Sequence, residues 1–508
     1  MKAATTSRPR VLDLPVHLDK AIRNQSGAVH AALRTAIIDG RLETGLQLPS
    51  SRSLAEQLGV RRNAVVAAYE HLASDGLLEA RHGAGTYVAP HLPARPVAAC
   101  PPALDVRPEP RRAFALGQTC VDDALLRRLA SHLRRHMTMA GAEELGYGDP
   151  RGSAYLRTQI AQHLSANRGV SCDPGCILVV NGTQHALRLC VDALFARGDA
   201  VWAEDPGYYA THTTLRAAGL RLVPVPVDGE GLDVAAGRRR RVKAKAAYVT
   251  PSHQFPMGVT MSMRRRIALI DWARATQSWI IEDDYDSEFR YAGPPLTALA
   301  GLAGERVIYI GTFTKTLFAG LRLAYLVVPP AILARVIAAR AAFDRFPLRF
   351  TQDAVADLMA EGLFARHIRR VRTRYKDARD AVVDVLRKEA GAALHVTEPA
   401  QGLHLVATLP HGMPVGSART VRDHAKVEAK LLSETQLSPG GPEGLILGVS
   451  GHDLRALRDA AHRLASAARE AKSLRVMPAK AGIQYALSSS SPRAHGVLGP
   501  RFRGDDTR

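Results

Sequence analysis

The chain has 508 residues and a formal charge of +20, with 68 Lys and Arg against 48 Asp and Glu, and 46% of its residues are hydrophobic. This length predicts at least two folding units, and this hydrophobic content excludes a chain that is disordered throughout. No hydrophobic run reaches the roughly 18–20 residues of a membrane span, and the start of the chain does not have the pattern of an export signal, so we expect a cytoplasmic protein. The positive charge favours a polyanionic partner.

Five cysteines are spread along the chain, at Cys100, Cys120, Cys172, Cys176 and Cys190. They are too few and too scattered for a disulfide framework. Cys172 and Cys176 have no second Cys or His pair at metal-ligand spacing, so we predict no metal site.

Residues 15–90 have the pattern of three short helices followed by a small β wing. The first helix has hydrophobic residues at every fourth position, on one face: Val29, Leu33 and Ile37. The second starts at a cap formed by Ser51 or Ser53, and the third runs from residue 62 to about residue 74. Residues 77–88 contain two short strands joined by a glycine-rich turn.

This arrangement predicts a DNA-binding domain, because a helix with donors at its N-terminal end fits the major groove. The residues expected to contact DNA lie at the helix starts and on the wing: Arg52, Arg61, Arg62, Asn63, Arg81, His82, Gly83 and Gly85. The alternative is a small packing module whose arginines are only solvated. The run from residue 49 to residue 89 resembles the winged helix-turn-helix of GntR-type transcription regulators. Arg61 and Ala64 replace the usual Ser and Thr, which affects the operator that is read and not the fold.

Prolines and alanines crowd residues 91–110, where periodicity is lost, and we predict an interdomain linker over residues 91–115. From residue 116 to residue 470, short hydrophobic runs alternate with helical patterns. These runs are predicted strands, at residues 177–180, 201–203, 220–225, 246–249, 279–281, 307–310 and 323–328. Such alternation predicts a mostly parallel sheet with helices on both faces.

The end of the predicted strand at 307–310 carries the first candidate site. A polar turn follows it with Lys315, and Arg322 comes seven residues later. In an apolar pocket the neutral amine of Lys315 would attack an aldehyde to form a Schiff base. The hydroxyls of Thr312 and Thr314 and the guanidinium of Arg322 would hold a phosphate. The alternative is a lysine on the protein surface.

Other predicted strands end in polar residues as well. Asp283 follows a hydrophobic strand and would need a cationic partner if it is buried, and a protonated pyridine nitrogen is such a partner. Gly182 and Thr183 open a helix after another strand, where backbone N–H groups suit phosphate. Tyr208 offers an aromatic face beyond a third strand. The carboxyl ends of strands are where open parallel sheets bind ligands.

The runs YGDPRG, TPSHQFPMG, IIEDDYDSEFRY and GTFTKTLFAGLR resemble fold-type I pyridoxal 5′-phosphate (PLP) enzymes of the class I aminotransferase family. The resemblance implies an α/β PLP-dependent transferase domain with a smaller C-terminal α+β subdomain. It makes Lys315 the Schiff-base lysine, Asp283 the partner of the pyridine nitrogen, Tyr285 the donor to the ring hydroxyl and Tyr208 the stacking ring. The phosphate site implied in this way contains Gly182, Thr183, Thr312, Thr314 and Arg322. Tyr147 resembles the tyrosine that reaches the phosphate of the neighbouring subunit in a head-to-tail homodimer.

The order of a GntR-type domain, a Pro-rich linker and an aminotransferase-like domain is similar to the MocR family of bacterial transcription regulators. Two family positions depart from the aminotransferase pattern. Ile446 stands where an Arg usually holds the substrate carboxylate, and Phe255 stands where an Asn usually contacts the ring, so that His253 or Gln254 would have to replace it.

Three hypotheses follow from these departures. The first is a regulator that binds PLP at Lys315 as its effector and controls PLP synthesis, as PdxR-type members do. The second is an active aminotransferase with a passive DNA-binding appendage, and the third is a regulator that senses an amino compound through bound PLP. The last segment, residues 471–508, has no period and clustered Ser, Gly and Arg, and we predict a disordered tail.

Overall fold

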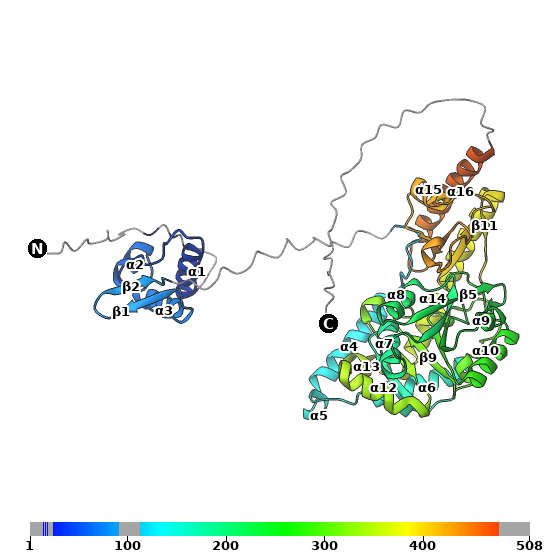
Figure 1. The fold of residues 1–508 in the computed structure, drawn as a ribbon, viewed down its shortest axis with the longest axis horizontal. Coiled ribbons are helices and arrows are strands. Elements are labelled where there is room, and N and C mark those ends of the chain that lie inside the picture. The colour runs from blue at the N-terminus through cyan, green and yellow to red at the C-terminus, as the bar shows by residue number, and fades with distance from the viewer. Residues whose placement is uncertain (1–13, 15, 17, 19–23, 91–111, 477–508) are drawn as a thin grey trace, which may run out of the picture. The chain divides into compact units, whose positions relative to one another are not determined.

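The computed structural model describes residues 14, 16, 18, 24–90 and 112–476. The chain divides into two compact units, Met1–Pro108 and Glu109–Arg508, and each is described by itself (Figure 1). Most of the predicted linker, residues 91–111, and most of the predicted tail, residues 477–508, lie outside the described residues. No helix in the described part of the chain is both long and apolar enough to cross a membrane.

The first unit is a three-helix bundle with a two-stranded wing, as the sequence predicts. Its elements are α1 (Gln25–Ile38), α2 (Ser51–Leu58), α3 (Arg62–Ser74), β1 (Leu78–Arg81) and β2 (Gly85–Val88). The strands β1 and β2 pair antiparallel. The predicted face of α1 is buried, and Leu54 and Leu72 pack against it from α2 and α3.

The predicted cap of α2 is wrong by one residue. Ser50 precedes the first helical residue, and its side chain accepts the backbone N–H of Ser53 at 3.2 Å. A cap residue must lie outside the helix for its oxygen to reach the N–H of the third helical residue, and Ser51 and Ser53 are already helical.

The second unit is built on an eight-stranded sheet with the order β3-β10-β9-β8-β7-β4-β5-β6. The strands are β3 (Ile177–Val180), β4 (Ala200–Asp205), β5 (Arg221–Asp228), β6 (Gly231–Leu232), β7 (Ala244–Val249), β8 (Trp279–Asp284), β9 (Val307–Thr312) and β10 (Ala324–Val327). The five strands from β9 to β5 are parallel, whereas β10 and β6 run antiparallel to their neighbours. The mostly parallel sheet is therefore confirmed, and a strand is found at each of the seven predicted positions.

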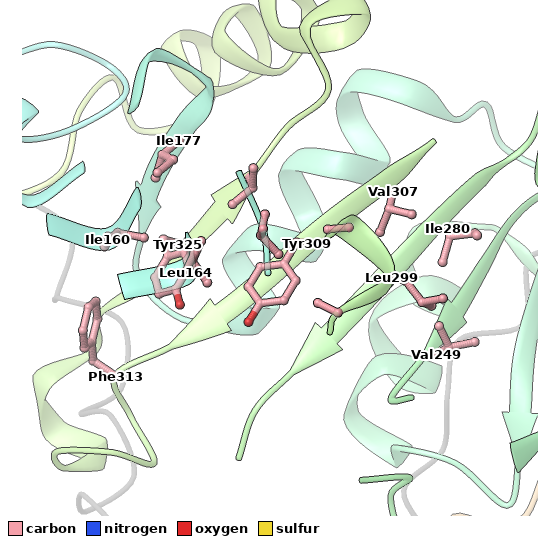
Figure 2. Packing of buried hydrophobic residues seen from close by; sticks show 14 of the residues in the cluster. Ile160, Leu164, Ile177, Val249, Ile280, Leu299, Val307, Tyr309, Phe313 and Tyr325 are labelled. Carbon is pink, nitrogen blue, oxygen red and sulfur yellow. The ribbon is translucent and has the colours of Figure 1, made fainter. Parts of the chain in front are cut away.

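Helices cover both faces of this sheet. They are α4 (Asp123–Thr138), α6 (Ala154–Arg168), α7 (Thr183–Leu194), α8 (Tyr209–Ala217), α9 (Val234–Arg239), α10 (Met263–Thr276), α11 (Leu299–Leu302), α12 (Pro330–Phe343) and α13 (Arg349–Ala360). The short helix α5 (Ala142–Leu145) follows α4. Side chains of β9 alternate between two hydrophobic clusters, with Val307 and Tyr309 in one and Ile308 and Ile310 in the other. Figure 2 shows the first of these clusters, where Ile280 and Val307 lie on neighbouring strands. Because both faces are buried, the strands are continuously hydrophobic.

A smaller subdomain follows in the chain. It contains α14 (Leu363–Ala390), α15 (Ser417–Ala425), α16 (Leu454–Val476) and an antiparallel sheet of order β11-β12-β14-β13. The strands are β11 (His395–Val396), β12 (His404–Thr408), β13 (Lys430–Leu431) and β14 (Gly444–Gly448). Figure 1 shows α15, α16 and β11 gathered at one end of the large unit. Leu405 and Leu447 pack toward α14 and α16, which leaves Val406 and Ile446 on the opposite face of the sheet.

Two predicted boundaries differ from the structure. The predicted linker includes Phe114, but this residue is fully buried in the core of the smaller subdomain, and its carbonyl accepts the N–H of Gly448 at 3.0 Å. The predicted tail includes residues 471–476, but these residues are the last part of α16. The composition locates the Pro-rich and Ser-rich stretches. It does not show that residues at the edges of these stretches are folded, because their packing partners lie elsewhere in the chain.

We predict that Phe114→Ala destabilises the large unit by about 3–5 kcal/mol, because it removes a buried aromatic ring and leaves a cavity. All three tryptophans, Trp202, Trp272 and Trp279, lie in this unit, so urea unfolding followed by tryptophan fluorescence measures the loss. Val415→Ala, at a side chain with 97% exposure, is the control and should change the unfolding free energy by less than about 0.5 kcal/mol. Equal unfolding midpoints for both variants would place Phe114 outside the core.

Candidate functional site

A cavity of about 230 Å³ lies where strands of the large sheet end. Its walls come from the turns that follow β3, β4, β7, β8 and β9 and from the start of β12. Nine of the ten predicted ligand residues line it: Lys315, Asp283, Tyr285, Tyr208, Gly182, Thr183, Thr312, Thr314 and Arg322. Residues that lie up to 140 positions apart in the sequence are therefore brought together at one edge, as expected for a parallel sheet.

One end of the cavity is suited to an anion. Gly182 precedes α7 with φ 111°, a conformation that favours glycine, and a Cβ at this position would lie 3.5 Å from a guanidinium nitrogen of Arg322. The open N-terminus of α7 and the charge of Arg322 both favour a phosphate at this end. The hydroxyl of Thr312 accepts the backbone N–H of Thr314 at 3.1 Å and shapes the adjoining turn.

Lys315 projects from that turn after β9 into the cavity wall. Its Nζ lies so close to Gly117 that a Cβ on this glycine would be 2.8 Å away. Burial lowers the pKa of Lys315, and the carboxylates of Asp286 and Asp283 partly oppose this shift. The lowered pKa increases the fraction of neutral amine, which is the nucleophilic form.

Asp283, at the end of β8, has one carboxylate oxygen without a partner. Its Oδ2 accepts the hydroxyl of Tyr248, whereas its Oδ1 is buried with no hydrogen bond among the described residues. Burial raises the pKa of Asp283 from 3.8 to about 7, and the hydrogen bond from Tyr248 opposes that increase. An unpaired, buried carboxylate oxygen in a cavity wall fits a cationic N–H group. Asp283 therefore fits the protonated nitrogen of a pyridine ring.

Tyr285 is held by the backbone and side chain of His253. Its hydroxyl donates to the His253 carbonyl at 3.1 Å, and the Nδ1 atom of His253 lies 2.8 Å from Asp286. Gln254 donates instead to the carboxylate of Glu204 at 3.1 Å. Neither His253 nor Gln254 lines the cavity, so neither takes over the ring contact of the usual Asn.

Tyr208 and Phe255 form an aromatic wall. Their ring centroids are 5.4 Å apart at an interplanar angle of 78°. His404 lies next to Phe255, with the ring centroids 5.2 Å apart, and its Nε2 donates to the carbonyl of Pro256 at 2.9 Å. Burial lowers the pKa of His404 to about 3, so this ring is neutral.

Several residues of the site are not predicted from the sequence. Tyr248 does not line the cavity but donates to Asp283 from the predicted strand at residues 246–249, and its position near the polar end of that strand is the signal that could have identified it. Gly117, Leu116 and His404 line the cavity. They come from the edge of the predicted linker and from the smaller subdomain, where no motif marks them.

Tyr147 is the predicted ligand residue that does not line this cavity. Its side chain is 81% exposed, and its ring packs edge-on against Phe346 with a centroid distance of 5.7 Å. Arg345 lies over the ring at 5.4 Å. Within one chain this tyrosine therefore has no contact with the ligand pocket.

In the first unit, all eight predicted DNA contacts are exposed: Arg52, Arg61, Arg62, Asn63, Arg81, His82, Gly83 and Gly85. The Nε of Arg62 lies 3.4 Å from the hydroxyl of Ser51, which ties the starts of α3 and α2 together. Arg81 stacks over Tyr87 on the wing at 4.6 Å. Gly83 and Gly85 both have positive φ, which the tight turn between β1 and β2 requires.

Comparison with known families matches both units. Residues 25–88 match bacterial regulatory proteins of the gntR family, and residues 114–462 match the aminotransferase class I and II family. The probable rhizopine catabolism regulatory protein MocR of Rhizobium meliloti is 34% identical over 477 residues, which cover 90% of this chain and 94% of that protein. The pyridoxine biosynthesis transcriptional regulator PdxR of Corynebacterium glutamicum is 33% identical over 427 residues, which cover 84% of this chain and 92% of that protein.

Solved aminotransferases share the fold of the large unit. An archaeal alanine:glyoxylate aminotransferase has 25% identity and a TM-score of 0.66, over 71% of this chain and 91% of that one. A kynurenine aminotransferase of Pyrococcus horikoshii, solved with pyridoxamine phosphate (PMP), has 26% identity and a TM-score of 0.65, over 70% of this chain and 90% of that one. These matches confirm the predicted fold classes, and PLP is the cofactor that fits an aminotransferase domain of this type.

We predict that Asp283 makes the stability of the cofactor-free protein depend on pH. Because its folded pKa of about 7 lies above the unfolded value, the folded state keeps a proton that the unfolded carboxyl has released between about pH 4 and pH 7. The free energy of unfolding therefore falls as the pH rises through this range. Asp283→Asn should make this slope shallower by up to about 1.4 kcal/mol per pH unit.

Urea unfolding at several pH values between 5 and 7 measures the slope. The control is Asp271→Asn, at an exposed carboxylate on α10, which should leave the slope of the wild type unchanged. Equal slopes for the wild type and Asp283→Asn would contradict a raised pKa at this position.

Proposed function

The chain belongs to the MocR family, in which a GntR-type helix-turn-helix domain is joined to a class I and II aminotransferase domain, and from this membership and the cavity we propose that it is a regulator whose effector is PLP. At the coarser level the protein is a transcription regulator with a DNA-binding domain and an aminotransferase-like domain. The proposal adds that PLP bound at Lys315 changes how the protein binds DNA. The similarity to PdxR supports a role in the control of PLP synthesis.

One observation carries this proposal: a single cavity provides a contact for each part of PLP. Lys315 supplies the amine for the aldehyde, Asp283 a carboxylate for the ring nitrogen, and Arg322 with the start of α7 a site for the phosphate. Bound PLP would supply an electron-withdrawing ring, and the residues of this chain hold, orient and desolvate it. Tyr208 and Tyr285 close the walls around the ring position.

Binding without turnover is the better proposal because the substrate side lacks a clamp. The position of the usual carboxylate-binding Arg is Ile446, which is fully buried. A charge-assisted hydrogen bond is worth about 1.5–3 kcal/mol, so an amino acid substrate loses that much binding energy here. An effector that needs no such clamp, PLP itself, keeps all the contacts that the cavity offers.

We also propose that the regulator acts as a homodimer. Several large apolar side chains near the ends of α4, α5 and α12 and at the start of α13 are more than half exposed in the single chain: Met137, Met139, Leu145, Tyr147, Phe343 and Leu348. Exposed apolar groups of this number are typical of a subunit interface. Tyr147 belongs to this set, which supports its proposed reach to the phosphate of a neighbouring subunit.

We expect Lys315→Ala to abolish the response to PLP without loss of DNA binding. The variant should bind PLP at least about tenfold more weakly, because it lacks the amine that captures the aldehyde. DNA fragments selected by the wild-type protein from a random pool serve as operators, and their affinities are measured by fluorescence anisotropy with and without PLP. For the wild type, PLP should change the operator affinity several-fold.

Lys376→Ala, at an exposed lysine on α14, is the matched control and should keep the response. A wild-type protein whose operator affinity does not change with PLP would contradict the proposal. A Lys315→Ala variant that still responds would place the effector site elsewhere.

For the DNA-binding face, we predict different effects at the two helix starts. Arg62→Ala should weaken operator binding by about 1–3 kcal/mol and relax sequence preference, because α3 presents this side chain to base edges. Arg52→Ala should weaken binding to all sequences, as expected for a phosphate contact. It should also reduce the slope of log affinity against log salt concentration by about one, because one ion fewer is released on binding. Arg34→Ala, on the exposed side of α1, is the control. Unchanged affinities at all three positions would exclude this face as the DNA contact.

A further inference from the structure

We propose that the cavity selects ligands that lack a carboxylate, so that a simple apolar amine binds beside PLP more tightly than the amino acid with the same side chain. This inference rests on the proposed function, because it concerns what the PLP-loaded cavity accepts next. It reverses the preference of an aminotransferase site, which is built around the carboxylate of its substrate.

The two positions that depart from the aminotransferase pattern lie in one hydrophobic cluster. Phe255 and Ile446 pack together with Val406 and Leu432, and Leu116 lies against them. The sequence places Phe255 and Ile446 almost 200 residues apart and does not show this contact. The structure therefore replaces two polar family positions by a single apolar wall.

This wall faces the cavity. Leu116, Phe255, Tyr208 and Tyr285 line the cavity, and all four belong to the cluster or pack against it. Ile446 lies behind them with no exposed surface, paired with Val406 across β12 and β14. Phe255 lines the cavity and Ile446 does not, although both belong to the same cluster.

No basic residue that lines the cavity within the described part of the chain is free to replace the clamp at this wall. Among the residues that line the cavity, Lys315 and Arg322 are committed to the aldehyde and phosphate ends, and His404 is neutral. Lys430 pairs with Ile446 across the sheet, but its Nζ lies 2.8 Å from a Glu434 carboxylate oxygen. The same nitrogen lies 3.8 Å from the centre of the Tyr209 ring.

The electrostatic consequence is a penalty for a carboxylate at this position. A carboxylate placed against the wall would lose water and gain no charged partner, and burial of an unpaired charge is unfavourable. An aliphatic group placed there would gain from leaving water. The wall therefore favours amines with an apolar side chain, and PLP alone, over α-amino acids.

Isoamylamine and L-leucine test this inference in the wild-type protein, because they have the same side chain and differ only by the carboxylate. The protein is first loaded with PLP and the loading is measured by absorbance. Isothermal titration calorimetry then gives the affinity for each compound. We expect isoamylamine to bind at least about tenfold more tightly than leucine.

A gain-of-function variant tests the wall directly. Phe255→Asn combined with Ile446→Arg creates both the space and the cation, and it should raise the affinity for leucine by about tenfold or more. Val415→Arg adds the same charge at an exposed position of the smaller subdomain and should leave the affinity for leucine unchanged. Because the comparison of ligands uses the wild type, a double variant that fails to fold does not remove the test.

Leucine that binds the wild type as tightly as isoamylamine would overturn the inference and leave the proposed function intact. Leucine binding that is lost in Lys430→Met would overturn it as well, because Lys430 would then be the clamp. A wild-type protein that does not load with PLP would instead contradict the proposed function, and the two failures are therefore distinguishable.

Discussion

The site depends on one constraint. Buried carboxylates at the carboxyl edge of the large sheet find only some of their hydrogen-bond and ion-pair partners within the described chain. Three consecutive acids end β8, and all three are buried. Asp284 accepts hydrogen bonds from Arg168 at 2.7 Å and from the Tyr309 hydroxyl at 2.5 Å. Glu282 accepts the N–H groups of Leu299 and Ala300 at the start of α11. Asp283 points to the other face and is the one of the three that lines the cavity. Its Oδ1, like the Oδ1 of Asp284, accepts no hydrogen bond among the described residues, and its Oδ2 is held by the Tyr248 hydroxyl rather than by an arginine.

This difference separates Asp284, which is paired with an arginine, from Asp283, which lines the cavity. A buried carboxylate that is paired with an arginine stabilises one packing arrangement, whereas one that lines a cavity with an unpaired oxygen is available to a ligand. Lys315 has the complementary property, since burial disfavours its charge. Burial therefore disfavours the charged forms of both the Lys315 amine and the Asp283 carboxyl group. A ligand with an aldehyde and a ring N–H would offer a partner to each of these groups. These properties support the proposed binding of the cofactor by Lys315 and Asp283.

Much of this could be predicted from the sequence. The spacing of hydrophobic runs located the strands, because both faces of the sheet are covered and the strands are continuously apolar. Polar residues at strand ends located Lys315, Asp283 and Tyr208, because parallel strands end at one edge. Asp283 and Asp284 point to opposite faces of the sheet, and it is Asp284 that meets Arg168. The sequence does not show this difference, because Arg168 lies more than 100 residues away. The contact of Phe255 with Ile446 and the core position of Phe114 depend likewise on contacts between distant segments, which no local pattern records.

The same contacts suggest how occupancy of the cavity reaches the smaller subdomain. The N–H of Gly207, next to Tyr208, donates to the carbonyl of Thr435 at 2.9 Å. The carboxylate of Asp205 accepts the N–H groups of Leu437 and Ser438 at 2.8 and 3.0 Å. The turn that presents Tyr208 to a ligand is thus bound to the segment that also contributes Leu432 to the apolar wall. A ligand that contacts Tyr208 and this wall interacts with both parts at once, and it stabilises whichever arrangement of the two gives it more contacts. The hydrogen bonds of Asp205 and Gly207 therefore join the turn that contains Tyr208 to the smaller subdomain.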